Sequence, residues 1–143
     1  MKLIKIEANA IQVTWPYVKE FIEKPLKVSQ GEYNLFDIYY CLIHGQLDLW
    51  VGVDSSKGIL GIMVSQVIYY PQYKALNIML VGTEPNTIKL WLDYSWNKET
   101  SPILKYAKEN NIKRIEGWTR DGWSKHLKNY GFKKYRTVLT KEI

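Results

Sequence analysis

The residue types that could do chemistry are few and scattered in this sequence. The only histidines, His44 and His126, are far apart, and no group of His, Cys and carboxylate residues has the spacing of metal ligands. The single cysteine, Cys41, lies three residues before His44, but a Cys–His pair without a third member is weak evidence for a nucleophile. No nucleotide-binding or serine-nucleophile motif occurs. The sequence therefore predicts no metal site.

Carboxylates offer another kind of chemistry, because a positioned carboxylate can act as a general base and remove a proton from a reacting group. Glu84 follows a predicted strand and is the best-placed candidate, with Asp48 as a second possibility. For both residues the alternative interpretation is a solvated surface acid.

The positive charge is concentrated in the second part of the chain. Residues 86–143 carry thirteen Lys and Arg against six Asp and Glu, whereas residues 1–85 carry seven against eight. Such a basic half suggests an acidic partner: nucleic acid, a phosphate-rich cofactor or an acidic protein. The tract 113–136 also interleaves basic residues with Trp and Tyr, which suits phosphate contacts and base stacking. Helix and strand periodicity already explains most of these aromatics as core, and a solvated Lys-rich surface is the alternative.

Length and composition indicate one globular domain over residues 1–143. The chain is 46% apolar and 24% charged, which is ordinary for a folded protein. The start of the chain shows no signal-peptide pattern, and no stretch approaches about 18 apolar residues, the length that spans a membrane. We expect a cytoplasmic protein that makes no membrane contact.

Hydrophobic periodicity supplies the elements that must position any site. It predicts a strand at 2–8, helices at 10–23 (ended by Pro25) and 35–43, and strands at 47–53, 59–70 and 73–81. A helical pattern follows over 86–110, where Ser101 and Pro102 either start a second helix or kink a single one. Then come a strand at 112–118, a short helix at 121–130 closed by Gly131, and a last strand at 132–140.

The predicted order is β-α-α-β-β-β-α-β-α-β, a mixed α/β sheet with helices on both faces. A strand–helix–strand unit spans 73–118, and such units are right-handed with parallel strands. The strands at 73–81 and 112–118 should therefore lie side by side and parallel.

This element order resembles the GNAT superfamily of acyl-CoA N-acyltransferases over nearly the whole chain. Within it, Gly117–Glu142 resembles small GNAT-like proteins of tailed bacteriophages and prophages. The matching residues are Arg120-Asp121-Gly122-Trp123, Leu127, Gly131-Phe132 and Leu139-Thr140-Lys141-Glu142. The resemblance implies a GNAT fold, acetyl-CoA as cofactor if the chain is active, and a phage virion or host protein as a possible partner.

The resemblance also places a cofactor loop after the strand at 73–81. GNAT enzymes keep glycines there, so that backbone N–H groups approach the CoA pyrophosphate at a helix N-terminus. Here Asn86, Thr87, Lys89 and Trp91 occupy those positions, and Gly82 lies too early. The residues that the resemblance assigns to the cofactor are Val81, Gly82, Asn86, Thr87, Ile88 and Lys89.

Many GNAT enzymes place a Tyr four residues before the Gly-Phe glycine, where it protonates the CoA thiolate. That position is Leu127 here, and Tyr130 is a weak substitute because it points elsewhere on a helix. If the chain is an enzyme, its catalytic residues are Glu84 as base and Tyr130 as acid. We therefore carry three hypotheses: a catalytically silent GNAT-like binding or structural protein, an acetyl-CoA-dependent N-acetyltransferase acting on an unknown amine, and a basic nucleic-acid-binding domain.

Overall fold

The computed structural model describes residues 1–97, 99–119 and 122–143. Within these residues five strands form one sheet in the order β1-β2-β3-β4-β5. Neighbours are antiparallel except β4 and β5, which are parallel. In chain order the elements are β1 (Lys2–Ile6), η1 (Ala8–Ala10), α1 (Ile11–Lys27), α2 (Leu35–Ile43), β2 (Asp48–Asp54), β3 (Gly58–Tyr69), β4 (Lys74–Thr83), α3 (Ile88–Trp96), α4 (Pro102–Glu109), β5 (Ile112–Gly117), α5 (Gly122–Leu127) and η2 (Lys128–Tyr130).

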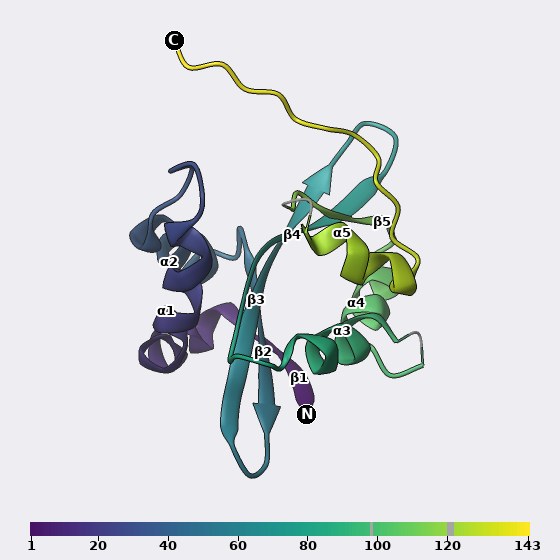
Figure 1. Cartoon of the computed structure of the whole chain (residues 1–143). Coiled ribbons are helices and arrows are strands. Elements are labelled where there is room, and N and C mark those ends of the chain that lie inside the picture. The colour runs from purple at the N-terminus through teal and green to yellow at the C-terminus, as the bar shows by residue number, and fades with distance from the viewer. Residues whose placement is uncertain (98, 120–121) are drawn as a thin grey trace.

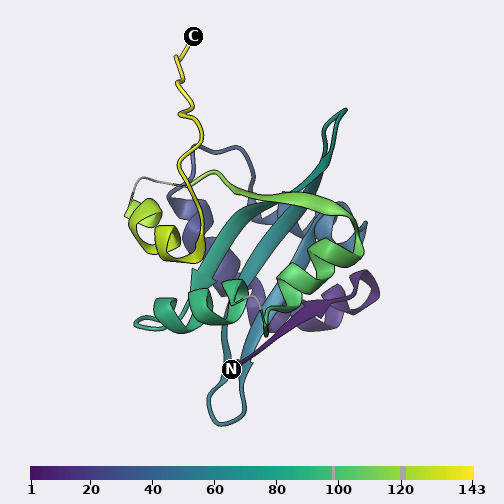
Figure 2. The same ribbon diagram turned by 90° about the vertical axis from the view of Figure 1, so that its right-hand side faces the viewer.

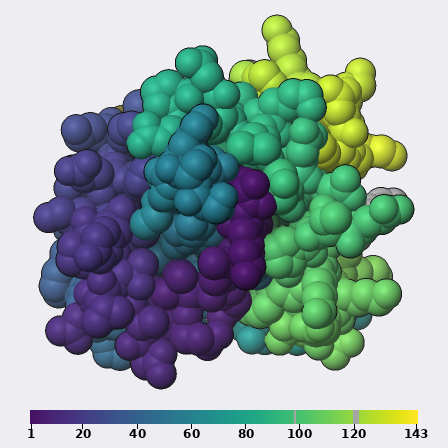
Figure 3. All heavy atoms as spheres, turned by 90° about the horizontal axis from the view of Figure 1, so that it is seen from below, coloured from purple at the N-terminus to yellow at the C-terminus, as the bar shows by residue number. Residues whose placement is uncertain are grey.

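Helices cover both faces of the sheet, as the sequence predicts. Helices α1 and α2 lie on one face, and α3, α4 and α5 lie on the other (Figures 1 and 2). Seen from below, the N-terminal strand β1 lies between the β2–β3 hairpin and the green α3–α4 region (Figure 3). Each face has its own buried apolar cluster, one including Val18, Ile38 and Ile62, the other Trp50, Leu76 and Ile103.

The predicted parallel pairing of the strands at 73–81 and 112–118 is confirmed. The pairing runs from Lys74 opposite Ile112 to Ile78 opposite Gly117. The helical stretch between them forms two helices rather than one kinked helix. The side chain of Ser101 caps α4 by accepting a hydrogen bond from Leu104 N at 3.1 Å, and Pro102 takes the first helical turn, where its missing N–H costs nothing.

The first helix is longer than predicted, because it continues through Pro25 to Lys27. A proline removes the hydrogen bond from its own N–H to the carbonyl four residues earlier, here that of Phe21. That carbonyl faces β4: a Cβ placed on Gly82 would lie 1.9 Å from Phe21 O. The Phe21 carbonyl therefore receives no hydrogen bond from Pro25. The helix nevertheless continues, because α1 packs against the sheet.

The expected last strand at 132–140 is the one predicted element that does not form. After Gly131, which has a left-handed φ of 87° and closes η2, the chain leaves the body as an extended tail (Figure 1). Val138 and Leu139 are 70% and 89% exposed. β-propensity mainly reflects packing against neighbouring strands and burial. Beyond Phe132, which packs against Trp96, this segment is exposed and pairs with none of the described strands.

Candidate functional site

Strand β5 ends before β4 does at one end of the sheet. It pairs with β4 up to its last residue, Gly117, which lies opposite Ile78, while β4 continues to Thr83. A β-bulge on β4 marks the same place, since Ser65 and Val64 of β3 pair with Ile78 and Leu80 and skip Met79. The bulge breaks the alternation of side chains, so that Met79 and Leu80 both pack on the α1–α2 side. Beyond Ile78, β4 has no pairing with β5 before it leads into α3.

The loop after β4 retains a tight turn without a glycine. Asn86 has a left-handed φ of 65°, a conformation that Asn adopts more readily than most side chains. The hydroxyl of Thr87 donates to Glu84 O at 2.6 Å and so does not cap α3. The first backbone N–H groups of α3, from Ile88 onward, therefore have no capping side chain. Such a helix start is suited to binding an anion.

Two hollows flank the start of α3. The first, of about 370 Å³, is lined by Ile88, Gly122, Trp123 and His126. The second, of about 350 Å³, lies against the β2–β3 hairpin and is lined by Asp54, Lys57, Ile59, Leu60, Glu84, Pro85, Thr87 and Leu90. Hydrogen bonds from the Ser56 hydroxyl and from the Ser56 and Lys57 amides lower the pKa of Asp54 to about 2. Glu84 therefore shares its hollow with a carboxylate that is ionised at neutral pH.

Tyr130 forms a hydrogen bond with Asp93, an acidic residue of α3. Its hydroxyl donates to Asp93 Oδ1, while Lys89 Nζ lies 2.8 Å from Asp93 Oδ2. The hydrogen bond to Asp93 raises the pKa of Tyr130, and the hydrogen bonds from Lys89 and then Tyr130 lower the pKa of Asp93. Asp93 also raises the pKa of Lys89. The sequence did not single out Asp93, which is one of the few polar residues of α3, with Lys89 and Ser95.

The other candidate residues have separate positions. Val81 packs in the cluster on the α3 side, and Leu127 joins the same apolar cluster. Gly82 lies against the backbone of α1, where any side chain would collide with Phe21. The structure therefore brings Lys89 and Tyr130 together through Asp93. Glu84 is apart from them and lines the hollow beside the β2–β3 hairpin. Of the motif residues at 120–123, Arg120 and Asp121 lie outside the described residues.

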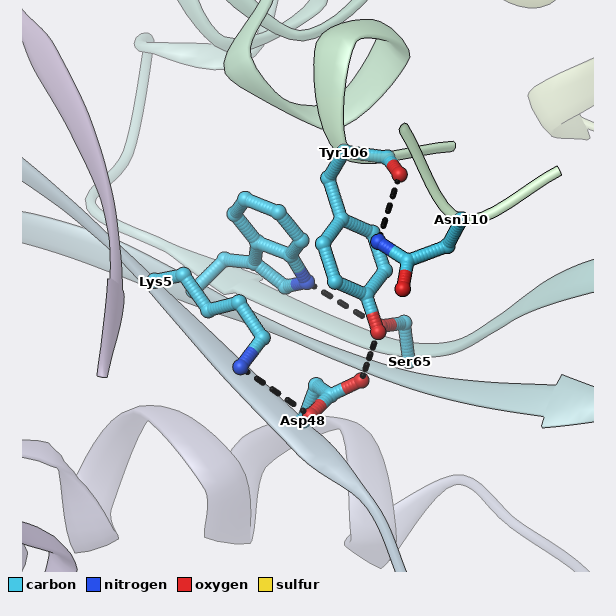
Figure 4. Close-up of polar contacts among 6 residues, drawn as sticks. Lys5, Asp48, Ser65, Tyr106 and Asn110 are labelled. Carbon is cyan, nitrogen blue, oxygen red and sulfur yellow. Dashed lines mark hydrogen bonds and ion pairs between the residues drawn. The ribbon is translucent and has the colours of Figure 1, made fainter. Parts of the chain in front are cut away.

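A polar cluster that sequence reasoning mostly missed lies between β1, β2 and α4 (Figure 4). Tyr106 donates its hydroxyl to Asp48 Oδ2 at 3.2 Å, and Lys5 Nζ lies 3.4 Å from Asp48 Oδ1. Beside them, buried Trp50 donates to Ser65 at 3.0 Å. Burial, followed by the charge of Asp48, raises the pKa of Tyr106 to about 12. Since Asp48 is already bound to two partners, this cluster holds the sheet edge to α4 rather than offering a free base.

Two classes of site find no support in the described part of the chain. Residues 1–97, 99–119 and 122–143 contain no cluster of three or more His, Cys, Asp or Glu side chains arranged to hold a metal ion. None of the helices formed by these residues has the length and apolarity needed to cross a bilayer.

Solved structures of acetyltransferases share this architecture. An aminoglycoside acetyltransferase from an uncultured soil metagenomic sample, in complex with sisomicin, aligns with a TM-score of 0.68 at 11% identity, over 99% of this chain and 95% of that one. A predicted acetyltransferase from Clostridium acetobutylicum with acetyl-CoA gives a TM-score of 0.65 at 18% identity, over 99% and 95%. Glucosamine-6-phosphate N-acetyltransferase from Arabidopsis thaliana gives 0.66 at 12% identity, over 99% and 97%. The chain has the GNAT fold.

Comparison of sequences alone does not show the GNAT fold. No family model matches the chain, and no curated protein matches it significantly. At these low identities the similarity to solved structures shows the GNAT fold, while function must be argued from the site. Asn86, Thr87, Ile88 and Lys89, which the GNAT resemblance assigns to a cofactor, lie between the end of β4 and the first turn of α3, and we call this end of the sheet the expected cofactor end.

Proposed function

We propose that this GNAT-fold chain is a binding or structural protein that does not transfer an acetyl group. The observation that supports the proposal most strongly lies at the proton-donor position. Leu127 packs in an apolar cluster and has no proton to give. The nearby phenol of Tyr130 donates to Asp93, which raises its pKa and makes it a weaker acid. The CoA thiolate would leave without general-acid help, a loss of about 100- to 10,000-fold in rate.

The cofactor loop supports the same proposal. Side chains of Thr87 and Lys89 stand where GNAT enzymes keep glycine, so fewer backbone N–H groups reach the pyrophosphate. The positive charge of Lys89 is already paired with Asp93, and the carboxylates of Asp54 and Glu84 line the adjacent hollow. Each charge-assisted hydrogen bond lost removes roughly 1.5–3 kcal/mol, and two such losses move a micromolar affinity to about 1 mM.

Calorimetric titration with acetyl-CoA tests this proposal. We expect a Kd of about 1 mM, and a micromolar Kd would contradict the proposal. If the side chain at the start of α3 hinders the approach, Thr87→Gly should tighten binding about tenfold, because glycine is tolerated as a helix cap. Thr100→Gly, in the turn before α4 and outside the loop, is the matched control and should leave the Kd unchanged.

A second candidate function is an acetyl-CoA-dependent N-acetyltransferase. Two features favour it: the left-handed Asn86 in the loop after β4, and the uncapped N–H groups of α3. In this reading Glu84 takes the proton of the amine and Tyr130 protonates the thiolate. One similar structure contains acetyl-CoA, which supports this cofactor for the fold.

We also propose a class of partner for the catalytically silent protein. The basic second half favours an acidic molecule or protein. The resemblance of residues 117–142 to small phage proteins suggests a phage virion or host protein, and this idea rests on those residues alone.

A further inference from the structure

The far end of the sheet carries a group of tyrosines and basic residues from three separate segments of the chain. The β3–β4 hairpin supplies Tyr69, Tyr73 and Lys74, β5 supplies Lys113 and Arg114, and the tail supplies Tyr135 and Arg136. We call these seven residues the basic aromatic surface. The hairpin and the tail project from the same end of the molecule (Figures 1 and 2).

Cations and rings alternate across this surface. The Arg114 guanidinium lies 5.0 Å from the Tyr73 ring centre and 5.2 Å from that of Tyr135, and Arg136 lies 5.0 Å from Tyr135. Lys113 lies 5.8 Å from Tyr73, and Lys74 lies 6.0 Å from Tyr69. Arg114 thus joins two tyrosines that are far apart in sequence, so the fold gathers this surface.

Two of the three rings are exposed. Tyr69 is 76% exposed and Tyr135 is 73% exposed, whereas Tyr73 is half-buried against Tyr70. The carboxylate of Glu116, which accepts a hydrogen bond from the Tyr70 hydroxyl at 2.9 Å, is a nearby negative charge. The surface therefore places four positive charges beside two exposed tyrosine rings.

We propose that the basic aromatic surface binds single-stranded nucleic acid. Lys and Arg meet the phosphates, while unstacked bases lie on tyrosine faces or guanidinium planes. A duplex hides its base faces, so it would use the charges but not the rings. An acidic chain such as polyglutamate would likewise use only the charges, since it has no flat ring to stack on the phenols. The combination of charge and open rings therefore favours single strands.

This surface is separate from the expected cofactor end. Lys74 begins β4 and the loop at Asn86 follows its end, and a strand of ten residues at about 3.3 Å each spans about 30 Å. The inference consequently goes beyond the proposed function and does not depend on it. Weak acetyl-CoA binding and single-strand binding succeed or fail in different assays.

Fluorescence anisotropy with a labelled oligothymidine of about 20 nucleotides tests the inference on the full chain. We expect binding at about 50 mM salt that weakens steeply by about 200 mM, because counterions are released. A duplex of equal length should bind several-fold more weakly. Tyr135→Ala and Tyr69→Ala should each weaken binding of the single strand by about 5- to 100-fold, the range for loss of one stacked base. Arg114→Gln should lower the salt slope by about 0.7.

Two controls use exposed residues away from this surface. Tyr17→Ala on α1 and Lys105→Gln on α4 should leave the affinity unchanged, and circular dichroism should show every variant folded. No binding at about 50 mM salt would overturn the inference, and so would equal affinity of Tyr17→Ala and Tyr135→Ala. A duplex or polyglutamate that binds as tightly as the oligothymidine would overturn it too.

Discussion

At the scale of single residues, Asp93 determines what Lys89 and Tyr130 can do. Its carboxylate receives the Lys89 ammonium on one oxygen and the Tyr130 hydroxyl on the other. Such a carboxylate neutralises the cation beside the cofactor loop and at the same time weakens the phenol as an acid. One acidic side chain on α3 thus reduces the contribution that the sequence assigned to Lys89 in cofactor binding and the one that it assigned to Tyr130 in catalysis.

Tyr106 carries the residue-scale prediction on stability. Tyr106→Phe removes its hydrogen bond to Asp48 while the edge-on contact with Trp50 at 5.4 Å can remain. We expect the free energy of unfolding to fall by about 1 kcal/mol, a low value because both partners are partly solvated. Urea unfolding at pH 7 measures it. Tyr17→Phe, an exposed phenol on α1, is the control and should change nothing.

The effect of Tyr106→Phe on the free energy of unfolding should depend on pH. The pKa of Tyr106 is raised from 10.0 to about 12 in the folded protein, so its contribution to stability is complete below pH 10 and is lost between pH 10 and 12. Tyr106→Phe lacks this loss, and the stability gap between the two proteins should narrow as pH rises from 9 to 11.5. A constant gap would show that the hydroxyl is not held as described.

At the scale of elements, α1 and β4 approach each other backbone to backbone. Pro25 removes the donor that would occupy the Phe21 carbonyl, and Gly82 removes the Cβ that would strike it. Gly82 thus serves the packing of α1 on the sheet. This role explains why β4 has a glycine at this position.

Gly82→Ala should therefore destabilise the protein by about 1–3 kcal/mol or more, because its Cβ would overlap Phe21 O and neither backbone can move freely. Thermal unfolding followed by circular dichroism measures the effect. Gly122→Ala, where an added Cβ meets nothing within 4 Å, is the matched control and should leave the melting temperature nearly unchanged. Equal melting temperatures for the two variants would refute this account of α1 and β4.

Periodicity predicted most elements because each buries one face against the sheet. The alternating strands and the spacing of Ile11, Val18 and Ile22 on α1 are of this kind. The end of α1 was mispredicted because propensity treats proline as a stop, whereas tertiary packing supports the helix beyond Pro25. The last strand was mispredicted because pairing partners are not visible in local sequence.

The candidate site was less predictable than the fold. The loop at Asn86–Lys89 could be located from the element order alone. The bond from Tyr130 to Asp93 joins residues 37 positions apart, and the basic aromatic surface joins three segments. The tract 113–136 already indicated four of the seven residues of this surface. No local pattern reports its contacts with the β3–β4 hairpin or the bond to Asp93, since these depend on how the elements pack.

At the scale of the whole molecule, the two ends of the sheet differ in the residues that they expose. One end holds the part of β4 beyond its pairing with β5, the start of α3 and two hollows, with Asp54 and Glu84 lining one of them. The other end holds the β3–β4 hairpin with its cations and tyrosine rings. Exposed Lys89 at the first end is paired with Asp93, whereas the cations at the far end are gathered around tyrosine rings.

The central claim is that this GNAT fold transfers no acetyl group, and release of free thiol from acetyl-CoA tests it most directly. The assay uses about 1 mM acetyl-CoA, a panel of amines that includes lysine peptides and aminosugars, and an active acetyltransferase as positive control. Our account predicts thiol release at the uncatalysed rate with every amine, and the same rate for Glu84→Gln and Tyr130→Phe. Turnover with any amine that disappears in Glu84→Gln or Tyr130→Phe would contradict the account and establish the enzyme.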